Sequence, residues 1–337
     1  MPLTSLGRVR NQLLLALIVG LVTAVPDING QATSSPASQL LISNPARLGT
    51  GHFSNILTWG TKLAALHSDF SGVELYTLGG AKLPMLSNPG GEAAAPLYAS
   101  LFVRGPKLFA VDIRGGRIVV ATSIRDETNL NSISIPAGVT GGCLLASGAA
   151  FYSPDAAGSI SVVNLDGHGQ KSFRLRAPGA FARVAELYAA VVAPVLGCIP
   201  AIDVVIVLRE DAPVIDAYTS SGKLLWHVNR PWFRPLSAVL KGAAIARVPP
   251  KDGFDSTIAA FAFGANELLI QTVFNPTGRQ EKGKPMQYTT MIIDGRDGAV
   301  VFHSNAVPRI VGAQGAKTFV EHGIRHDAVS LRPGVLP

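Results

Sequence analysis

The sequence predicts an all-β fold, a six-bladed β-propeller, from three observations. The chain holds 35 glycines and 23 prolines among 337 residues, a load of turn formers that suits many short strands and suits a helical bundle badly. Short apolar segments ending in a polar turn with glycine recur along the chain. Two stretches containing such segments align with each other without a gap. Repetition of one β-unit predicts a ring of blades.

The overall composition indicates a folded body with an unremarkable surface charge. Hydrophobic residues make up 47% of the chain and charged residues only 15%, which argues against disorder. The net charge is +7, but the 29 basic residues are scattered without a dense run. A slightly basic, solvated surface explains this better than a polyanion-binding stripe. We expect no nucleic-acid partner, since no matching module is present either.

The N-terminus has the order of a secretory signal peptide. Arg8 and Arg10 precede the apolar run Leu13–Val25, and the small-residue site Gly30–Ala32 follows before a polar stretch. The run has 13 residues, whereas a membrane-spanning helix needs roughly 20. We therefore expect cleavage after Ala32 rather than an uncleaved anchor.

This interpretation divides the chain into three parts. Residues 1–32 are the signal peptide, residues 33–38 are a linker and residues 39–337 are the propeller domain. We expect the mature protein to be exported to the periplasm or the extracellular space, with no membrane span of its own.

The recurring segment has the sequence pattern of a β-hairpin. An apolar, often β-branched run leads into a polar turn whose glycine supplies a positive φ, and a second apolar run usually follows. The five copies are VELYTLGGAKL (73–83), LFAVDIRGGRIV (108–119), ISVVNLDGHG (160–169), VIDAYTSSGKLLW (214–226) and MIIDGRDGAVVF (291–302). Their anchoring glycines, Gly80, Gly116, Gly167, Gly222 and Gly298, are spaced by 36, 51, 55 and 76 residues. Spacings of this size with variable loops indicate propeller blades.

Two copies can be compared position by position. Cys143 precedes Gly167 by 24 residues, and Cys198 precedes Gly222 by the same distance. Apolar positions match at Phe151/Ile206, Tyr152/Val207, Ile160/Ile215 and Val163/Tyr218, and acidic turn residues match at Asp155/Glu210. Each unit then contains an inner strand, a turn such as residues 209–213, a second strand and an outer strand such as 223–228. No unit can bury both of its faces alone, so the units must stack around an axis.

The number of blades follows from counting these units. The five copies and a last hairpin, residues 317–332, make six, and residues 39–43 (QLLIS) supply the missing outer strand of the last blade. Seven blades are the alternative, because residues 232–262 form a long, partly unassigned stretch. The rival architecture is a pair of β-sandwiches, which the repeated unit disfavours.

These features together resemble secreted bacterial six-bladed β-propeller proteins related to the NHL-repeat group. The likeness covers roughly residues 45–332 and is carried by the signal peptide, the spaced glycine-ended segments and the closing C-terminal hairpin. The resemblance implies a protein that binds ligands or partners. Some propellers related to that group are lactonases or other hydrolases, so an enzymatic role is also implied as an alternative.

The only two cysteines occupy matching positions of adjacent units. Export to an oxidising compartment permits a disulfide between Cys143 and Cys198, provided that their Cα atoms lie within about 7 Å. We favour two separately buried cysteines, because a free cysteine behaves as a small hydrophobe.

Seven residues are the candidate binding residues. WHVNRPWFRP (226–235) is the densest aromatic and basic cluster, and such a cluster suits sugars or anionic small molecules. The same cluster is also explained by packing of an outer strand against the next blade, and we favour that explanation. The polar turn before the fourth hairpin adds further candidates. The full set is Arg209, Glu210, Asp211, Trp226, Arg230, Trp232 and Arg234.

Two functions remain open from the sequence. The first is an exported propeller that binds an unknown small molecule, glycan or protein partner through one mouth of its central axis, and we favour this one. The second is a metal-dependent hydrolase or lactonase whose carboxylates converge at the axis. The acidic residues that lie near predicted turns are Asp155, Asp203, Glu210, Asp211, Asp216 and Asp294. No catalytic motif is present, so catalytic residues, metal and cofactor stay unassigned.

Overall fold

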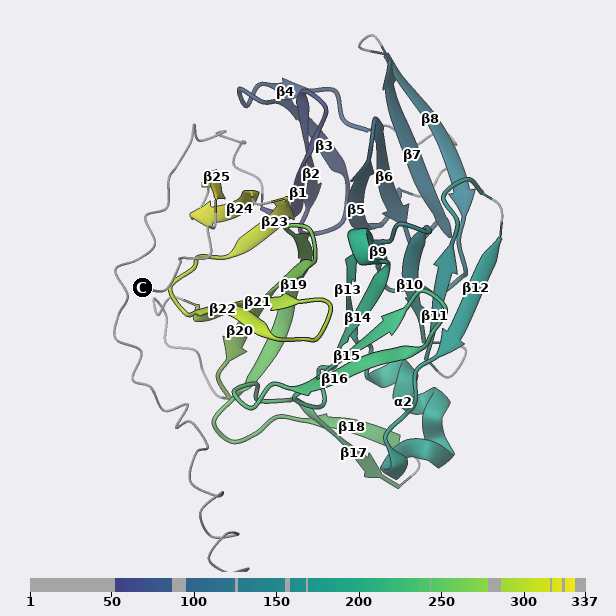
Figure 1. Cartoon of the computed structure of the whole chain (residues 1–337), viewed down its shortest axis with the longest axis vertical. Helices are drawn as coiled ribbons and strands as arrows, with labels where there is room; N and C mark the ends of the chain where they lie inside the picture. The colour runs from purple at the N-terminus through teal and green to yellow at the C-terminus, as the bar shows by residue number, and fades with distance from the viewer. Residues whose placement is uncertain are drawn as a thin grey trace, which may run out of the picture. The chain divides into compact units, whose positions relative to one another are not determined.

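Figure 1 shows the computed structural model, in which small β-sheets are arranged side by side. It describes residues 52–86, 95–124, 127–154, 158–167, 169–242, 244–277, 286–315, 317–322 and 325–330. The chain divides into two compact units, residues 1–39 and 40–337, and every described residue belongs to the second. The described strands form five four-stranded sheets, one three-stranded sheet and one two-stranded sheet.

The first four sheets follow one another along the chain. The first contains β1 (Phe53–Trp59), β2 (Lys62–His67), β3 (Val73–Thr77) and β4 (Lys82–Leu83). The second contains β5 (Tyr98–Arg104), β6 (Lys107–Asp112), β7 (Arg117–Ile124) and β8 (Glu127–Ser134). The third contains β9 (Gly142–Leu144), β10 (Ala149–Ser153), β11 (Ser159–Val163) and β12 (Gln170–Arg174). The fourth contains β13 (Val195–Ile199), β14 (Val204–Leu208), β15 (Val214–Thr219) and β16 (Leu224–Asn229).

The remaining elements complete the described part of the chain. The fifth four-stranded sheet contains β19 (Phe254–Phe263), β20 (Glu267–Asn275), β21 (Tyr288–Asp294) and β22 (Val300–Ser304). The three-stranded sheet contains β23 (Ile310–Gln314), β24 (Lys317–His322) and β25 (Arg325–Ser330). The hairpin β17 (Ser237–Lys241) and β18 (Ala244–Val248) precedes the fifth sheet. The short helices are η1 (Gly179–Val184), α2 (Ala185–Val191) and η2 (Pro200–Ile202).

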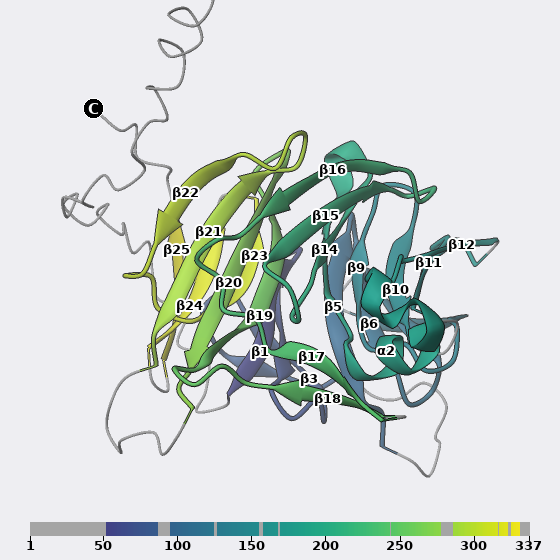
Figure 2. The same ribbon diagram turned by 90° about the horizontal axis from the view of Figure 1, so that it is seen from below.

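The first strands of the six larger sheets form a ring, and we call them the inner strands. They contact one another in the order β1, β5, β9, β13, β19 and β23, and β23 contacts β1 in turn. Sheets that share one axis in this way define a β-propeller, as the sequence predicts. Figure 2 shows the same sheets from below, with the inner strands toward the middle and β17, β18 and α2 on the near side.

Apolar side chains on both faces of the middle strands explain why the sheets stack. All five residues of β10 are buried. Phe151 packs in one cluster with Phe109 of the preceding sheet, whereas Ala150 packs in another with Val205 of the following sheet. Each fully buried large apolar side chain contributes about 1.5–3 kcal/mol relative to exposure. A sheet on its own would leave one of these faces in water.

Hydrogen bonds across the seams show that neighbouring inner strands run in the same direction. Near the strand beginnings, the Asn55 side chain donates to the Leu101 carbonyl at 3.2 Å, and the Gly142 amide donates to Ser100 Oγ at 3.1 Å. Near the strand ends, the Arg104 guanidinium donates to the Leu145 carbonyl at 2.8 Å. We call the opening where the inner strands begin the upstream mouth, and the opening where they end the downstream mouth.

Gly312 on β23 lies very close to the backbone of β1. A Cβ atom at this position would lie 1.9 Å from the Ile56 carbonyl oxygen of β1. Only glycine permits this approach of one backbone to another. The last described sheet therefore meets the first sheet at a residue without a side chain.

The glycine-ended segments match one another as predicted in four of five cases. Gly167 (φ +87°) and Gly222 (φ +88°) lie in the turn between the third and fourth strands of their sheets. Their amides donate to the carbonyls of Asn164 and Thr219 at 3.2 and 2.9 Å. The two glycines that were predicted to be homologous therefore occupy equivalent turn positions with the same conformation, although Gly222 packs against Phe173 and Gly167 is open to solvent.

The turn glycine of the second segment lies at a different place in its sheet from the other four. Gly80 and Gly298 also lie between third and fourth strands, with φ of +87° and +79°. Gly116 (φ +60°) lies instead between the second and third strands, β6 and β7. Any tight hairpin turn can use a positive-φ glycine, so the pattern identifies a hairpin without identifying its place in the sheet.

Cys143 and Cys198 form a disulfide bond between β9 and β13, with their Cα atoms 5.4 Å apart. Their matching positions place both on inner strands of adjacent sheets, as the alignment predicts. The structure therefore differs from our preference for two separately buried cysteines. Contact between neighbouring inner strands brings the two Cα atoms within bonding distance.

Six sheets take part in the ring, but only five of the described ones are complete four-stranded blades, so the predicted count of six blades, with seven as the alternative, is wrong. The last unit is the three-stranded sheet β23–β25. The strand that was expected to complete it, residues 39–43, lies outside the described residues, as does the predicted signal peptide. Within residues 232–262, β17 and β18 form a hairpin that packs on α2 instead of joining the ring. Most of the residues of this hairpin are at least partly exposed. The hairpin therefore has no pair of apolar faces that neighbouring blades would have to bury.

Two further features of the sheets were not predicted. The strand that precedes the turn at residues 209–213 was interpreted as the innermost of its unit, but it is the second strand, β14, and β13 lies inside it. The connection before β13 contains η1 and α2. No helix in the described part of the chain is long and apolar enough to cross a membrane.

We predict that the disulfide is a main stabiliser of the ring. Replacing both cysteines (C143S/C198S) should lower the free energy of unfolding by about 3–4 kcal/mol, because the bond closes a loop of 55 residues. Urea unfolding followed by tryptophan fluorescence measures this. Wild-type protein treated with dithiothreitol should match the double variant, and equal stability of oxidised wild type and variant would contradict the prediction.

We also predict that Gly312→Ala opens the contact between β23 and β1. The added Cβ meets backbone atoms that cannot yield, so the variant should lose about 3 kcal/mol of stability. Gly179→Ala is the matched control, because a Cβ at Gly179 meets nothing within 4 Å. Thermal unfolding of the two variants side by side tests this, and equal midpoints would refute it.

Candidate functional site

Arg209, Glu210 and Asp211 lie in the turn between β14 and β15. The register pairs Leu208 at the end of β14 with Val195 at the start of β13. The turn therefore lies on the side of the sheet that faces the upstream mouth. A polar turn after a fully buried strand is what the sequence predicts here, because VVIVL leaves no polar group until residue 209.

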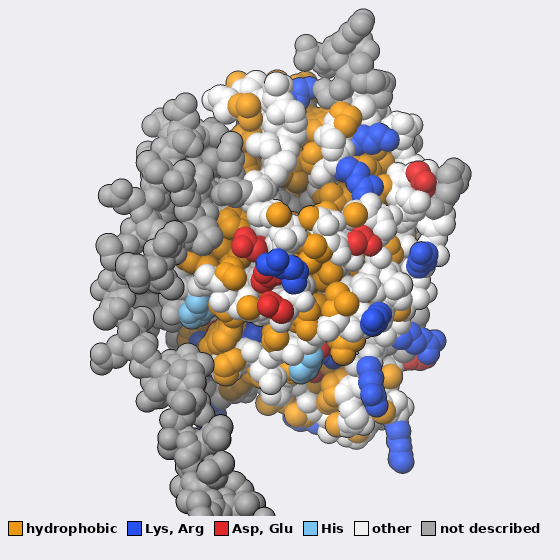
Figure 3. Space-filling view, in the orientation of Figure 1, with side chains coloured by type: hydrophobic (Ala, Val, Ile, Leu, Met, Phe, Trp, Pro, Cys, Tyr) orange, Lys and Arg blue, Asp and Glu red, His pale blue; other side chains and the backbone are white. Residues whose placement is uncertain are grey.

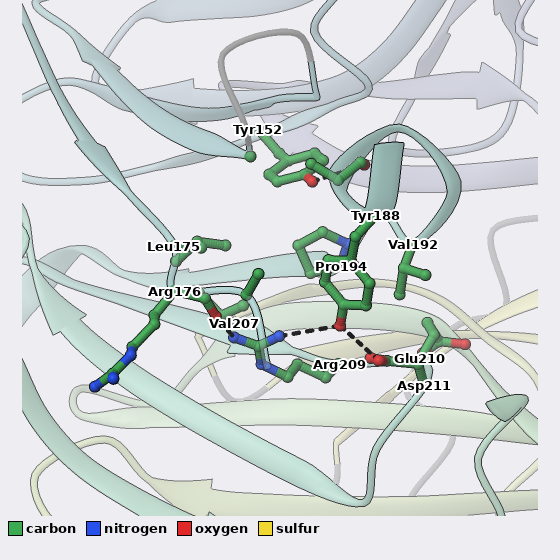
Figure 4. A pocket seen from close by; sticks show the side chains of 13 residues that line it. Tyr152, Leu175, Arg176, Tyr188, Val192, Pro194, Val207, Arg209, Glu210 and Asp211 are labelled. Carbon is green, nitrogen blue, oxygen red and sulfur yellow. Dashed lines mark hydrogen bonds between the residues drawn. The ribbon is translucent and has the colours of Figure 1, made fainter. Parts of the chain in front are cut away.

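The side chains of this turn form a polar cluster with α2 (Figure 4). Tyr188 Oη donates to Asp211 Oδ2 at 2.5 Å, and the Arg209 guanidinium donates to Tyr188 Oη at 3.3 Å. A second nitrogen of Arg209 donates to the Arg176 carbonyl at 2.8 Å. Burial, reinforced by Asp211, raises the pKa of Tyr188. Tyr188 therefore keeps its proton and remains the donor to Asp211 at neutral pH.

The cavity beside this cluster is small. Its volume is about 20 Å³, and Tyr152, Tyr188, Arg209 and Asp211 contribute to its lining. A cavity needs about 10–15 Å³ to hold one water molecule. The site therefore has room for about one water molecule. Asp211 Oδ1 is buried and has no hydrogen-bond partner, so it could accept a hydrogen bond from such a water. The cluster fastens α2 to the fourth sheet and offers no space for an organic ligand.

Glu210 joins the fourth sheet to the fifth. Both of its carboxylate oxygens accept from the Thr257 amide of β19, at 3.1 and 3.2 Å. Burial raises the pKa of Glu210 above its ordinary value, against the opposing effect of the Thr257 hydrogen bond. The side chain is 8% exposed. Glu210 is thus positioned to hold two sheets together and is not presented to a ligand.

Arg230 is a buried packing residue. Only 1% of it is exposed, its guanidinium lies 3.7 Å from the centre of the Phe233 ring, and it donates to the Arg209 carbonyl at 2.5 Å. Burial lowers the pKa of Arg230 to about 10. A residue this deeply buried cannot meet a sugar or an anion from solution.

The other members of the aromatic and basic cluster contact different neighbours. Trp226 Nε1 donates to the Gly295 carbonyl of the fifth sheet at 2.8 Å. Arg234 forms a bidentate ion pair with Asp255, in which Nε and Nη2 each donate to a carboxylate oxygen at 3.1 Å. Trp232 is 38% exposed, and its ring centre lies 5.4 Å from that of His303. These are packing contacts between neighbouring sheets, and the structure does not bring the candidates together into one site.

The large cavity of the molecule lies on the axis, between the inner strands, and we call it the axial cavity. Its volume is about 540 Å³, within the usual range of about 300–1,000 Å³ for small-molecule sites. Residues from all six inner strands line it. The lining from the first three inner strands and Phe70 is Ser54, Asn55, Leu57, Phe70, Ala99, Ser100, Leu101, Phe102, Val103, Gly142, Cys143 and Leu144. The rest is Val195, Leu196, Cys198, Pro200, Ala201, Ile258–Ala262, Gly264, Ala265, Ala313, Gln314 and Gly315.

The described lining combines apolar side chains with a few uncharged polar ones. None of the described residues that line the axial cavity is Asp, Glu, Lys, Arg or His, although 15% of the chain is charged. Its polar side chains are Ser54, Asn55, Ser100 and Gln314. Each one takes part in a hydrogen bond that joins strands: Ser54 donates to the His67 carbonyl at 3.3 Å, and Gln314 accepts from the Thr58 amide at 2.8 Å.

The acidic residues named from the sequence do not converge on the axis. Asp203 accepts from Ser147 and Ser220, Asp216 pairs with Arg209 and His227, and Asp294 pairs with Arg296. Asp155 lies outside the described residues. Among the described residues, no group of three or more His, Cys, Asp or Glu side chains is placed to hold a metal ion.

The surface shown in Figure 3 is mixed in character. Lys and Arg side chains are separated from one another on this face and form no continuous stripe. The absence of a nucleic-acid partner stays a prediction from the sequence.

Sequence reasoning missed the residues of the axial cavity. The inner strands are short, and stretches such as GCL and AAFA combine small residues without clear alternation. The matched cysteines were the one available signal, because both lie in the cavity wall.

Comparison with known proteins leaves the function open. No protein-family model matches the sequence, and a comparison with curated proteins finds no match. A streptogramin B lyase structure is 10% identical, covering 86% of this chain and 97% of that one, with a TM-score of 0.48. Virginiamycin B lyase from Staphylococcus aureus is 10% identical, covering 87% and 99%, with a TM-score of 0.46. The β-propeller domain of Cps50 (Swd1) from Myceliophteria thermophila is 11% identical, covering 86% and 99%, with a TM-score of 0.46.

These similarities are too distant to transfer an activity. The ring of sheets itself defines the class: the chain is a β-propeller with an uncharged axial cavity. Its function has to be argued from that cavity.

We predict a specific pH dependence from Glu210. Its pKa is raised from 4.5 in the folded state, so the folded protein holds this proton more tightly than the unfolded chain. As pH rises above 4.5, wild type should lose stability relative to Glu210→Gln, until the raised pKa is passed. Urea unfolding between about pH 4 and pH 7 measures this. Glu186→Gln, at an exposed position of α2, controls for loss of one negative charge, and a pH-independent difference for Glu210→Gln would count against the assignment.

Proposed function

We propose that the protein is an exported β-propeller that binds a small molecule in its axial cavity. The observation that carries this proposal is the cavity of about 540 Å³ bounded by the six inner strands. Export is supported by the N-terminal sequence, in which Arg8 and Arg10 precede an apolar run and a small-residue site. The proposal keeps the sequence-based hypothesis of binding through one mouth of the axis.

A small molecule fits this cavity better than a glycan or a protein partner. Glycan recognition needs many polar partners, and the described lining offers only four polar side chains, each of which already takes part in a hydrogen bond between strands. A protein partner needs a contact surface of about 800 Å² on each side. The axial cavity is instead a recess lined by 27 residues, the kind of concave site that small molecules occupy.

No observation favours the alternative of a metal-dependent hydrolase. Such an enzyme needs carboxylate or imidazole ligands that meet at one point. The described lining of the axial cavity contains neither group. Binding without an assigned reaction is therefore the function that the geometry supports best.

We predict that filling the cavity abolishes ligand binding. Ile258 lines the cavity and is 38% exposed, so Ile258→Trp should occupy the site without disturbing the core. Val301→Trp is the matched control, because Val301 is 43% exposed on the outer strand β22 and is not part of the lining.

Thermal unfolding in the presence of a small-molecule library provides the measurement. A ligand at about 100 times its Kd stabilises the folded state by about 2.7 kcal/mol. We expect hits for wild type and Val301→Trp that Ile258→Trp does not show. If all three proteins respond to the same compounds equally, the axial cavity is not the binding site.

A further inference from the structure

The volume of the axial cavity sets the first limit on its ligand. A space of about 540 Å³ corresponds to roughly 18 water molecules at about 30 Å³ each. Water in such a space meets no charged side chain of the described lining, and where it lies against apolar side chains such as Ile258 and Phe70 it lacks hydrogen-bond partners. Its replacement by an apolar molecule is favourable, because poorly ordered water is released and apolar surface is buried.

The chemistry of the wall sets the second limit. A charged ligand group would need an opposite charge or several hydrogen bonds, and no described lining residue carries a charge. The Asn55 amide group donates to the Leu101 carbonyl, and Ser100 Oγ accepts from the Gly142 amide. Both side chains thus contribute to contacts between inner strands, and neither carries a charge that could pair with a charged ligand.

Two large apolar side chains are exposed toward this space. Ile258 of β19 is 38% exposed and Phe70 is 40% exposed, although both line the cavity. Phe70 lies in the turn between β2 and β3, at the upstream mouth, with a φ of +61°. A bulky residue rarely adopts this conformation because it is strained. An occupant with a hydrocarbon surface would cover both side chains.

We propose that the axial cavity takes an uncharged, hydrocarbon-rich molecule, of the chemistry shared by acyl chains and isoprenoids. This inference rests on the proposed function and names the ligand class for the same site. The molecule enters at the upstream mouth past Phe70 and lies against the inner strands, with Ile258 and the disulfide of Cys143 and Cys198 in its wall.

A pair of fluorescent probes with one scaffold tests the proposal. N-phenylnaphthylamine is neutral, and anilinonaphthalene sulfonate adds a single negative charge to the same rings. The neutral probe should bind wild type with increased fluorescence, and the sulfonated probe should bind about tenfold more weakly or not at all. Displacement by dodecanol or by farnesol then distinguishes a linear acyl chain from a branched isoprenoid as the source of the hydrocarbon.

Two variants locate the bound probe. Ile258→Glu places a carboxylate in the wall and should weaken binding of the neutral probe about tenfold, whereas Val301→Glu on β22 should leave it unchanged. Phe70→Gly removes an apolar contact at the mouth. Because glycine adopts a positive φ without strain, this variant should remain folded, which circular dichroism checks, and bind the neutral probe more weakly.

The disulfide supplies a readout that is independent of fluorescence. Both cysteines line the cavity, so an occupant should slow the reduction of their bond by tris(carboxyethyl)phosphine. Slower reduction with the neutral probe, together with the effect of Ile258→Glu, supports the proposal. If sugars or charged compounds bind in an Ile258-dependent manner and the neutral probe does not, the ligand class is wrong while the proposed function stands. If no compound binds in an Ile258-dependent manner, both are wrong.

Discussion

The contact of inner strands around one axis is the constraint on which this structure depends. A sheet such as β9–β12 has apolar side chains on both faces, and each face is buried only when another sheet lies against it. The ring satisfies this condition for one sheet after another, from β1 to β23 and back to β1. Small residues permit the closest approaches, most clearly where Gly312 meets the Ile56 carbonyl. The disulfide adds a covalent link at the seam between β9 and β13.

The same constraint creates the cavity. The six inner strands bound an open space on the axis, although its lining includes large side chains such as Phe102, Phe261 and Ile258. The polar groups near the axis are used in seams between strands, and the charged residues form pairs elsewhere, as in Arg209 with Asp216. What remains at the centre is a recess whose described lining carries no charged side chain. This separation of polar contacts from the axis is the physical basis for proposing a hydrocarbon-rich ligand.

The ring could be predicted from the sequence because its signals are local. Apolar runs, positive-φ glycines such as Gly167 and Gly222, and the alignment of Cys143 with Cys198 each depend on a few neighbouring residues. The number of complete blades could not be predicted, for two reasons. Gly116 lies in the turn between the second and third strands of its sheet, whereas the other four glycines lie between third and fourth strands. The hairpin β17–β18 also lies outside the ring. The roles of candidate site residues were equally hidden. Trp226 contacts Gly295, and Arg234 pairs with Asp255, partners that are distant in the sequence and that only the folded ring brings near.

The central claim is that six inner strands surround an apolar space. A crystal structure of the purified protein under xenon pressure tests this most directly, because xenon collects in apolar cavities and avoids polar ones. The account predicts xenon between β5, β13 and β19, close to Ile258 and the disulfide. An axis filled with ordered water and free of xenon, or sheets that share no axis, would contradict it.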